Sequence, residues 1–289
     1  MAAKPSLRGR PAHLDRAFGY LALGAALLVL LILGLIAVTM TQRAAPVLSQ
    51  MGFDFFTTSD WSEADQKFGA LSFIWGTIYT AIIAVLFAVP ISMGVALFIT
   101  QVAPARMKKP LIYLIDLLAV VPSVVFGLWG ILVLVPHLHK SFLTAGIILA
   151  IMITPIITSL AREVIETTPQ SDKEAAYALG ATKWEMIQAA VIPHSKGGIV
   201  GAVMLGLGRA MGETIAAALV IGSVAQVKLS PMSSGDSMPA VIANQWGEAG
   251  DMQKSALIGL AVTLFVMTII VNLVASAIVR RSMIKSRGA

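Results

Sequence analysis

The sequence predicts an all-α integral membrane protein with six transmembrane helices and both termini in the cytoplasm. The first observation is composition: of 289 residues, 57% are hydrophobic and only 12% are charged, whereas soluble domains carry about 25% charged residues. The second is that the apolar residues form runs long enough to cross a hydrocarbon core of about 30 Å. The third is that lysines and arginines gather at the ends of these runs.

Six apolar runs reach the roughly 20 residues that a membrane helix needs. They cover approximately residues 19–40, 70–99, 111–135, 142–161, 199–224 and 256–279. The first run follows a basic start, as a secretory signal does, but it is too long and no small-residue cleavage site follows, so we expect an uncleaved helix. The chain has no cysteine and its four histidines are scattered, so we expect no metal site.

The orientation follows from the basic residues, because those that flank membrane helices stay in the cytoplasm. With both termini inside, fifteen lysines and arginines fall on the cytoplasmic side and five on the outer side. The expected organisation is a basic cytoplasmic N-terminus (1–18), a first transmembrane helix (19–40), a periplasmic loop (41–69), a core with five transmembrane helices (70–280) and a basic cytoplasmic tail (281–289). The core includes a cytoplasmic loop (162–198) and a periplasmic loop (225–254).

The cytoplasmic loop is predicted to contain a short helix followed by a glycine turn. Ser171 and Glu174 have the spacing of a capping box, so the helix is expected to begin near Asp172. Gly180 is expected to end it.

A second helix is expected from about Thr182, and it would place Trp184, Ile187 and Val191 on one side until Pro193 breaks it. The periodicity leaves two interpretations open. The loop either folds back onto the inner membrane surface or forms a compact docking surface for a soluble partner.

Two charges lie inside the fifth apolar run. Arg209 is about 15 Å into a helix that begins near Ile199, because each residue rises about 1.5 Å, and an ionised group at that depth is costly. Glu213 follows four residues later, so both side chains are expected on one helix face, where they can pair. Gly208 and Gly212 have a spacing that lets another helix or a substrate approach the backbone.

The charged pair has two interpretations. It forms either a salt bridge that only orients packed subunits or part of an anion path, because a guanidinium presents donors suited to phosphate and other oxyanions. Asp116, about five residues into the third run, is expected to reach the inner surface and to have a structural role. No nucleophile, carboxylate pair or histidine cluster lies within the spans, so no catalytic residues are expected.

The cytoplasmic loop resembles the EAA loop of ABC importer permeases. In EAAYALG and the following VIP, the residues on the positions of that pattern are Glu174, Ala175, Ala176, Gly180 and Pro193. One departure is Ala190, where the family usually has isoleucine. The resemblance implies a type I ABC importer permease fold and a helix in this loop that couples to a separate cytoplasmic ATPase. The chain itself has no phosphate-binding loop for nucleotide.

Three further stretches resemble the PstC-type subunit of phosphate-specific permeases: GLGRAMGETIAA, MITPIITSLAREVIETTP and MPAVIANQWGEA. This resemblance implies that Arg209 and Glu213 act in transport. It also implies a PstA-like permease partner, two PstB-like ATPases that use ATP and magnesium, a PstS-like periplasmic phosphate-binding protein and a bacterial inner-membrane location. The alternatives are an ABC permease for sulfate, molybdate or another solute and, in a different class, an ion-driven carrier that needs no ATPase.

Overall fold

The structure is a computed structural model that describes residues 12–287. Residues 1–11 of the expected basic N-terminus and 288–289 of the expected tail lie outside the described residues. In chain order the elements are α1 (Ala12–Met51), α2 (Asp54–Thr57), β1 (Trp61–Ser62), β2 (Lys67–Phe68), α3 (Leu71–Leu97), η1 (Phe98–Val102), α4 (Ala105–Val120), α5 (Ser123–Trp129), η2 (Gly130–Leu134), α6 (Val135–Leu138), α7 (Phe142–Glu166), α8 (Gln170–Ala178), α9 (Lys183–Met186), η3 (Ile187–Val191), α10 (Ile192–Gly212), α11 (Ile215–Val220), α12 (Met238–Gln245) and α13 (Asp251–Arg287).

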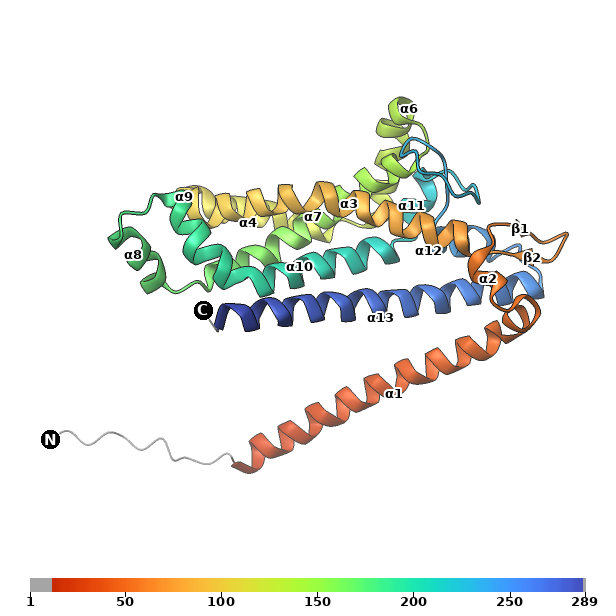
Figure 1. Ribbon diagram of the computed structural model, residues 1–289, viewed down its shortest axis with the longest axis horizontal. Helices are drawn as coiled ribbons and strands as arrows, with labels where there is room; N and C mark the ends of the chain where they lie inside the picture. Colours follow the sequence, from red (N-terminus) through yellow and green to blue (C-terminus); the bar gives the residue numbers. More distant parts are fainter. Residues whose placement is uncertain (1–11, 288–289) are drawn as a thin grey trace.

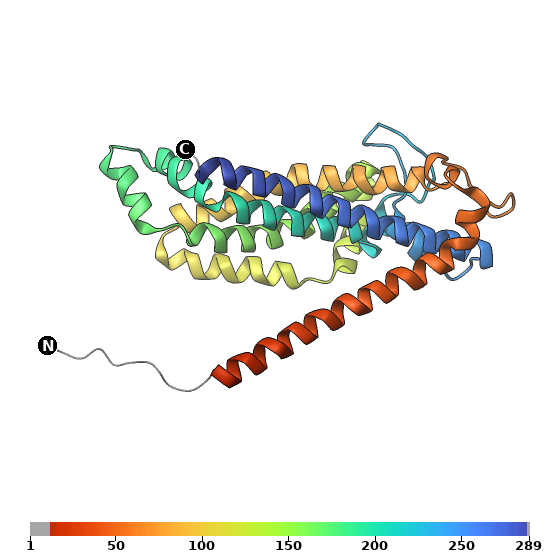
Figure 2. The same ribbon diagram turned by 60° about the horizontal axis from the view of Figure 1, so that its bottom comes forward.

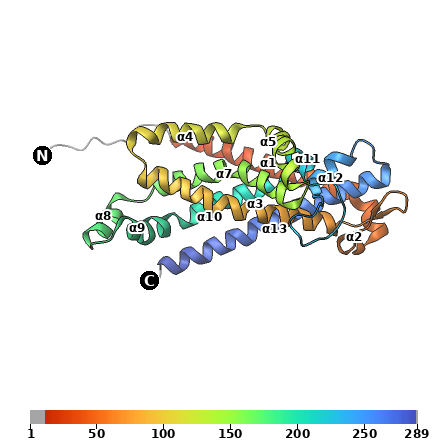
Figure 3. The same ribbon diagram turned by 90° about the horizontal axis from the view of Figure 1, so that it is seen from above.

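The long helices run along one axis and form a bundle from which α1 diverges (Figures 1 and 2). The start of α1 and the end of α13 lie at the same end of the molecule as α8 and α9 (Figure 3). The small hairpin of β1 and β2 lies at the opposite end, together with α2 and α12 (Figure 1). This arrangement agrees with an even number of membrane crossings.

Five helical segments of the described chain are long and apolar enough to cross a membrane: 17–51, 71–102, 142–166, 183–212 and 251–277. A sixth span is present if α4 and the segment 123–138 are counted together, but these are bent by 87°. The expected single helix at 111–135 is therefore wrong. The bend follows from Pro122, because the residue before a proline is driven out of the helical region, and Val121 has an extended backbone with ψ of 127°.

α7 is the central helix of the bundle and has the most buried apolar stretch of the five spans. It packs along α3, where Gly146 lies directly against the side chain of Ile83. Large apolar side chains of α7, such as Ile153 and Ile157, are fully buried against α3 and α10. The absence of a side chain at Gly146 thus lets α3 and α7 approach closely. The other helices are arranged around this pair.

The first span is longer than expected. α1 continues to Met51 and includes Pro46, so the expected periplasmic loop at 41–69 begins as helix. The rest of that loop packs Phe55 and Phe68 against Phe73 of α3 and Leu257 of α13 in an outer hydrophobic cluster. This cluster connects the end of α1 to the bundle, whereas the most apolar stretch of α1 has none of its residues buried.

Candidate functional site

Arg209 lies in the last turn of α10. Figure 1 shows that α10 ends part of the way along α13, so this last turn lies inside the bundle's length and not at one of its ends. The residue is exposed and lines a cavity of about 670 Å³. A guanidinium at this depth is costly in lipid, so its open surroundings require water, an anion or a partner subunit.

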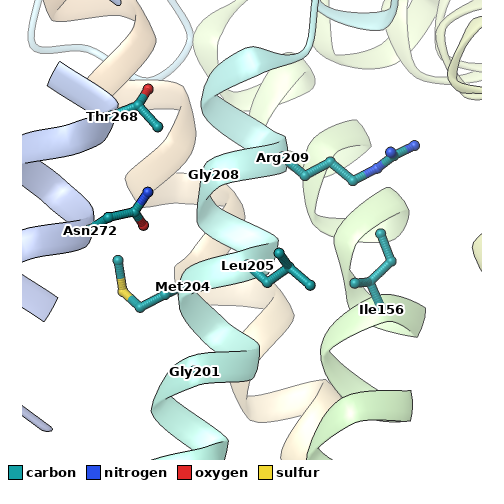
Figure 4. A pocket seen from close by; sticks show the side chains of 8 residues that line it. All are labelled: Ile156, Gly201, Met204, Leu205, Gly208, Arg209, Thr268 and Asn272. Atoms are coloured by element: carbon teal, nitrogen blue, oxygen red, sulfur yellow. The ribbon is translucent and has the colours of Figure 1, made fainter. Parts of the chain in front are cut away.

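The cavity crosses the face of α10 between α7 and α13. Its lining residues are Ile156, Gly201, Met204, Leu205, Gly208, Arg209, Thr268 and Asn272. Figure 4 shows Arg209 extending from α10 on the side of Ile156, whereas Asn272 and Thr268 project from α13 on the other side of α10. Gly201 and Gly208 lie between these two walls, and their lack of side chains leaves the surface of α10 open.

The Arg209 guanidinium has no carboxylate partner among the described residues. The ion pairs in that part of the chain join Arg162 to Glu163 and to Glu166, both at 3.7 Å. The positive charge of Arg209 is therefore not neutralised within the chain. An uncompensated guanidinium on a cavity is suited to attract an anion with several oxygen acceptors.

The expected pairing of Arg209 with Glu213 is wrong. α10 ends at Gly212, Glu213 turns the chain out of the helix with ψ of 124°, and no ion pair joins the two side chains among the described residues. The Glu213 carboxylate instead accepts a hydrogen bond from the backbone N–H of Ala216 at 3.3 Å. The fifth span is thus a long helix, a break and the short helix α11, not one helix over 199–224.

After the break, α11 packs against α5. Gly127 of α5 lies close enough to Ala216 that an added Cβ would be 2.8 Å from the Ala216 Cα. α5 itself follows the bend at Pro122. α11 thus packs against a segment about 90 residues earlier in the chain, a contact that single-sequence periodicity could not indicate.

Gly208 and Gly212 do not pack against another helix of this chain, because a Cβ added to either would meet no atom within 4 Å. The helix contacts of α10 are made instead by Gly198, which lies against Val164, and Gly206, which lies against Ile157. Sequence reasoning missed these two positions. For Gly208 and Gly212, close approach by a substrate or by a partner subunit stays a prediction.

The loop expected in the cytoplasm forms a projecting knob, defined as residues 170–186, at the end of the bundle (Figure 1). Glu174 and Ala175 are exposed and Ala176 is half-buried. Gly180 follows α8 in the left-handed region with φ of 83°, as expected for a glycine that ends a helix. Leu179 is 90% exposed, so the tip of the knob presents an apolar side chain that no described residue covers.

Two details of the knob differ from expectation. α8 begins at Gln170 without a side-chain cap, and the capping box is formed by Thr182 and Glu185 at the start of α9. Ser171 and Glu174 have the same spacing, but Pro169 already sets the extended backbone that starts α8, with ψ of 139°. Of the expected face of the second helix, Ile187 and Val191 are buried but Trp184 is exposed.

Pro193 does not break the second helix, contrary to expectation. The helix is continuous over 183–212, with the wider turn η3 at 187–191 immediately before the proline. Pro193 falls in the first turn of α10, where a missing N–H is tolerated because the local widening accommodates it. The second helix of the knob, α9, is therefore continuous with the helix that carries Arg209.

Asp116 lies on α4, which begins at Ala105, six residues before the expected apolar run that contains Asp116. Its expected reach to the inner surface stays a prediction. Its carboxylate accepts a hydrogen bond from the hydroxyl of Ser159 at 3.1 Å. This contact joins α4 to α7 and agrees with a structural role.

The fold is that of a multi-pass membrane protein, with five or six candidate spans in the described residues and a cavity along one of them. The family model of the binding-protein-dependent transport system inner membrane component matches residues 68–283. The chain therefore belongs to this family of bacterial inner-membrane permeases, and it is a transport subunit. Such multi-pass subunits are not themselves catalytic.

Within this family the chain is similar to phosphate transport system permease proteins named PstC. The protein from Mesorhizobium japonicum is 38% identical over 89% of this chain and 87% of its own length. The Haemophilus influenzae protein is 38% identical over 91% and 92%, and PstC 2 of Mycobacterium tuberculosis is 37% identical over 95% and 93%. The family predicted from the sequence is thus confirmed.

Solved structures of ABC transporters share the fold. A bacterial alginate ABC transporter matches with a TM-score of 0.64 and 17% identity over 94% of this chain and 98% of that chain. The inward-facing MetNI methionine transporter matches with a TM-score of 0.63 and 17% identity over 77% and 99%. These likenesses confirm the predicted helical ABC importer permease fold.

Proposed function

We propose that this chain is the permease subunit of an ATP-driven importer of inorganic phosphate and forms half of the path that the anion takes through the inner membrane. The observation that carries this proposal is the Arg209 guanidinium, which is exposed on a cavity within the span and has no carboxylate partner in the described chain. The names of the PstC relatives support phosphate as the anion.

Glu213 has a role near this path that differs from charge pairing. Its carboxylate caps the first turn of α11 next to the break that ends α10. The break follows Gly212, less than one turn after Arg209, so it sets where α10 stops lining the path. In this proposal, Glu213 holds the break, and Arg209 attracts the anion.

The partners follow from the family. The other half of the path is a PstA-like permease, the anion is delivered by a PstS-like periplasmic phosphate-binding protein, and two PstB-like ATPases hydrolyse ATP with magnesium. The knob at 170–186 is the proposed contact with one ATPase, because its tip exposes Leu179 and Tyr177 beside small residues. Both termini and the knob are on the cytoplasmic side in this arrangement.

The decisive experiment is reconstitution of the complex in liposomes with the receptor outside and ATP inside. Labelled phosphate uptake and ATP turnover are measured while unlabelled phosphate, sulfate or molybdate is added in excess. We expect only phosphate to compete and to stimulate ATP turnover. Equal competition by sulfate or molybdate would assign the chain to another oxyanion, and uptake that persists with an inactive ATPase would assign it to the ion-driven carriers.

A further inference from the structure

Asn272 is a polar residue in the membrane-spanning part of α13. It lies in the stretch TIIVNLVAS, about 30 Å from the start of the helix at about 1.5 Å per residue. Its neighbours Ile270 and Leu273 are exposed apolar residues, as expected for a helix in lipid. A carboxamide in hydrocarbon is unfavourable unless its donors and acceptor have partners.

The Asn272 side chain is exposed, and no hydrogen bond joins it to another described residue. Thr268, one turn earlier on the same wall, is different because its hydroxyl donates to the backbone oxygen of Leu264 at 2.8 Å. Asn272 therefore has two N–H donors and one acceptor available to something outside this chain. Thr268 has its donor already occupied.

Asn272 lines the same cavity as Arg209, on the opposite wall (Figure 4). The surface between them is formed in part by Gly201 and Gly208, at which an added Cβ would meet no atom within 4 Å. A small hydrated anion on this surface has a charged donor on one side and a neutral donor on the other. Apart from Thr268, whose hydroxyl already donates to the backbone of its own helix, the remaining lining is apolar, so Arg209 and Asn272 supply most of the polar side-chain chemistry of the cavity.

We propose that Asn272 is a second anion-contacting residue of the transport path, donating hydrogen bonds from its amide to the oxyanion that Arg209 attracts. This inference rests on the proposed function and names a residue that it does not use. A neutral donor suits the role because transport requires sites that bind the ion yet release it, and a second guanidinium would hold the anion more strongly.

The contrasting possibility is that Asn272 hydrogen-bonds a helix of the partner permease, as polar residues between membrane helices do. The two possibilities differ in whether water reaches the Asn272 side chain. A residue on an anion path contacts water, whereas one in a packed helix interface does not. A thiol placed at the position reports this difference, because it reacts as the thiolate, which forms in water.

The absence of cysteine from this chain makes the experiment direct. Asn272→Cys, Arg209→Cys and the control Leu273→Cys are each introduced into the full complex, and labelling of this subunit is followed by mass. Leu273 is adjacent and 64% exposed but does not line the cavity. The probes are the anion sulfonatoethyl methanethiosulfonate and its trimethylammonium cation counterpart.

We expect Asn272→Cys to react with the anionic probe about tenfold faster than Leu273→Cys, to prefer the anionic to the cationic probe, and to be slowed by inorganic phosphate. Reaction of Arg209→Cys without reaction of Asn272→Cys would overturn this inference and leave the proposed function intact. If neither thiol reacts, the cavity is not an aqueous path, and the proposed role of Arg209 fails as well.

A second pair of variants tests the anion contact itself. Asn272→Asp has nearly the same size but places a negative charge on the path, whereas Asn272→Gln keeps the amide. We expect phosphate uptake to fall at least fivefold in Asn272→Asp and to be largely retained in Asn272→Gln, with equal copurification of the partner subunits. Equal uptake by Asn272→Asp and wild type would overturn the proposal.

Discussion

At the scale of single residues, the environment of Arg209 separates a transport role from a structural one. A structural arginine in a membrane bundle needs a carboxylate or carbonyl partner, since its desolvation is otherwise uncompensated. The two described carboxylates nearest in sequence do not serve: Glu213 caps α11, and Glu185 caps α9 by accepting from the Thr182 backbone N–H. The guanidinium is therefore available to a ligand from outside the chain.

Replacing Arg209 with Gln is expected to lower phosphate uptake at least tenfold while the complex still assembles. The reason is that hydrogen bonds to charged groups contribute about 1.5–3 kcal/mol and the Gln side chain lacks the charge. Uptake is measured in the reconstituted complex, with Asp116→Asn as the comparison, because that residue bonds Ser159 away from the cavity. Normal uptake by Arg209→Gln would remove its transport role.

Gly206 and Gly208 form a matched pair of positions on α10. A Cβ at Gly206 would be 2.7 Å from Ile157 side-chain atoms, whereas one at Gly208 would meet nothing within 4 Å. We expect Gly206→Val to destabilise the complex by about 1–3 kcal/mol through overpacking, measured as a lower thermal midpoint. Gly208→Val should leave the midpoint unchanged and reduce uptake, because it narrows the cavity; the reverse pattern would contradict this assignment.

At the scale of elements, the helix breaks and turns determine what each segment can do. The wide turn η3 lets α9, the second helix of the knob, and α10 form one continuous helix over 183–212, so we expect movement of the knob to reach the turn that carries Arg209. The sharp turn at Gly180 shapes the tip of the knob. The wide turn η3 and the turn at Gly180 are both features of the backbone. We expect both to affect how ATP hydrolysis is coupled to transport.

Replacing Gly180 with Leu is expected to lower the uptake obtained per ATP hydrolysed. The backbone there has φ of 83°, and an L-residue in that conformation costs roughly 1–2 kcal/mol, so the tip should change shape. ATP turnover and uptake are measured together. Gly180→Asn is the control because asparagine tolerates this conformation better, and equal coupling in all three proteins would argue against the knob as the ATPase contact.

The outer segment before α12 contains a buried carboxyl, Asp236, which is only 3% exposed. Burial raises the pKa of this group from 3.8 to about 7, against the opposing effect of the hydrogen bond from the Ser237 backbone N–H. Between these two values the folded protein retains a proton that the unfolded chain has released. The stability of the fold should therefore decrease as pH rises through this window and become independent of this group above it.

This prediction is tested with Asp236→Asn. The thermal midpoint of the wild-type complex should be lower at about pH 8 than at about pH 5, because this group contributes up to about 1.4 kcal/mol per pH unit within the window. The variant, which cannot ionise, should lose this part of the pH dependence and be the more stable protein at about pH 8. An unchanged pH dependence would mean that Asp236 does not carry the proton.

At the scale of the whole molecule, the bundle places its functional parts at different levels along one axis. The knob lies at one end and the elements of the outer hydrophobic cluster, α2, β2 and α12, lie at the other (Figure 1). The cavity is lined by residues of α7, α10 and α13 between these two ends. α1 packs mainly on α13 near the outer cluster and leaves much of its apolar surface exposed. That surface is available to lipid or to the partner permease.

The topology predicts that both termini and the knob share the cytoplasmic side. A fluorescent protein fused after residue 289 should therefore fluoresce in the cytoplasm, and alkaline phosphatase fused there should be inactive. As a control, the same reporters inserted in the outer segment 225–237 should give the opposite result. Active phosphatase at the C-terminus would reverse the orientation that the basic residues indicate.

The sequence by itself determined which segments enter the membrane, the expected orientation and the family. These depend on local quantities: the length of apolar runs, the charges beside them and turn residues such as Gly180. Only the tertiary structure decided the 87° bend at Pro122, the end of α10 before Glu213, whose carboxylate bonds α11, and the shared cavity of Arg209 and Asn272. These features arise where helices distant in sequence compete for space, and a hydropathy pattern carries no information on which neighbour each face will meet.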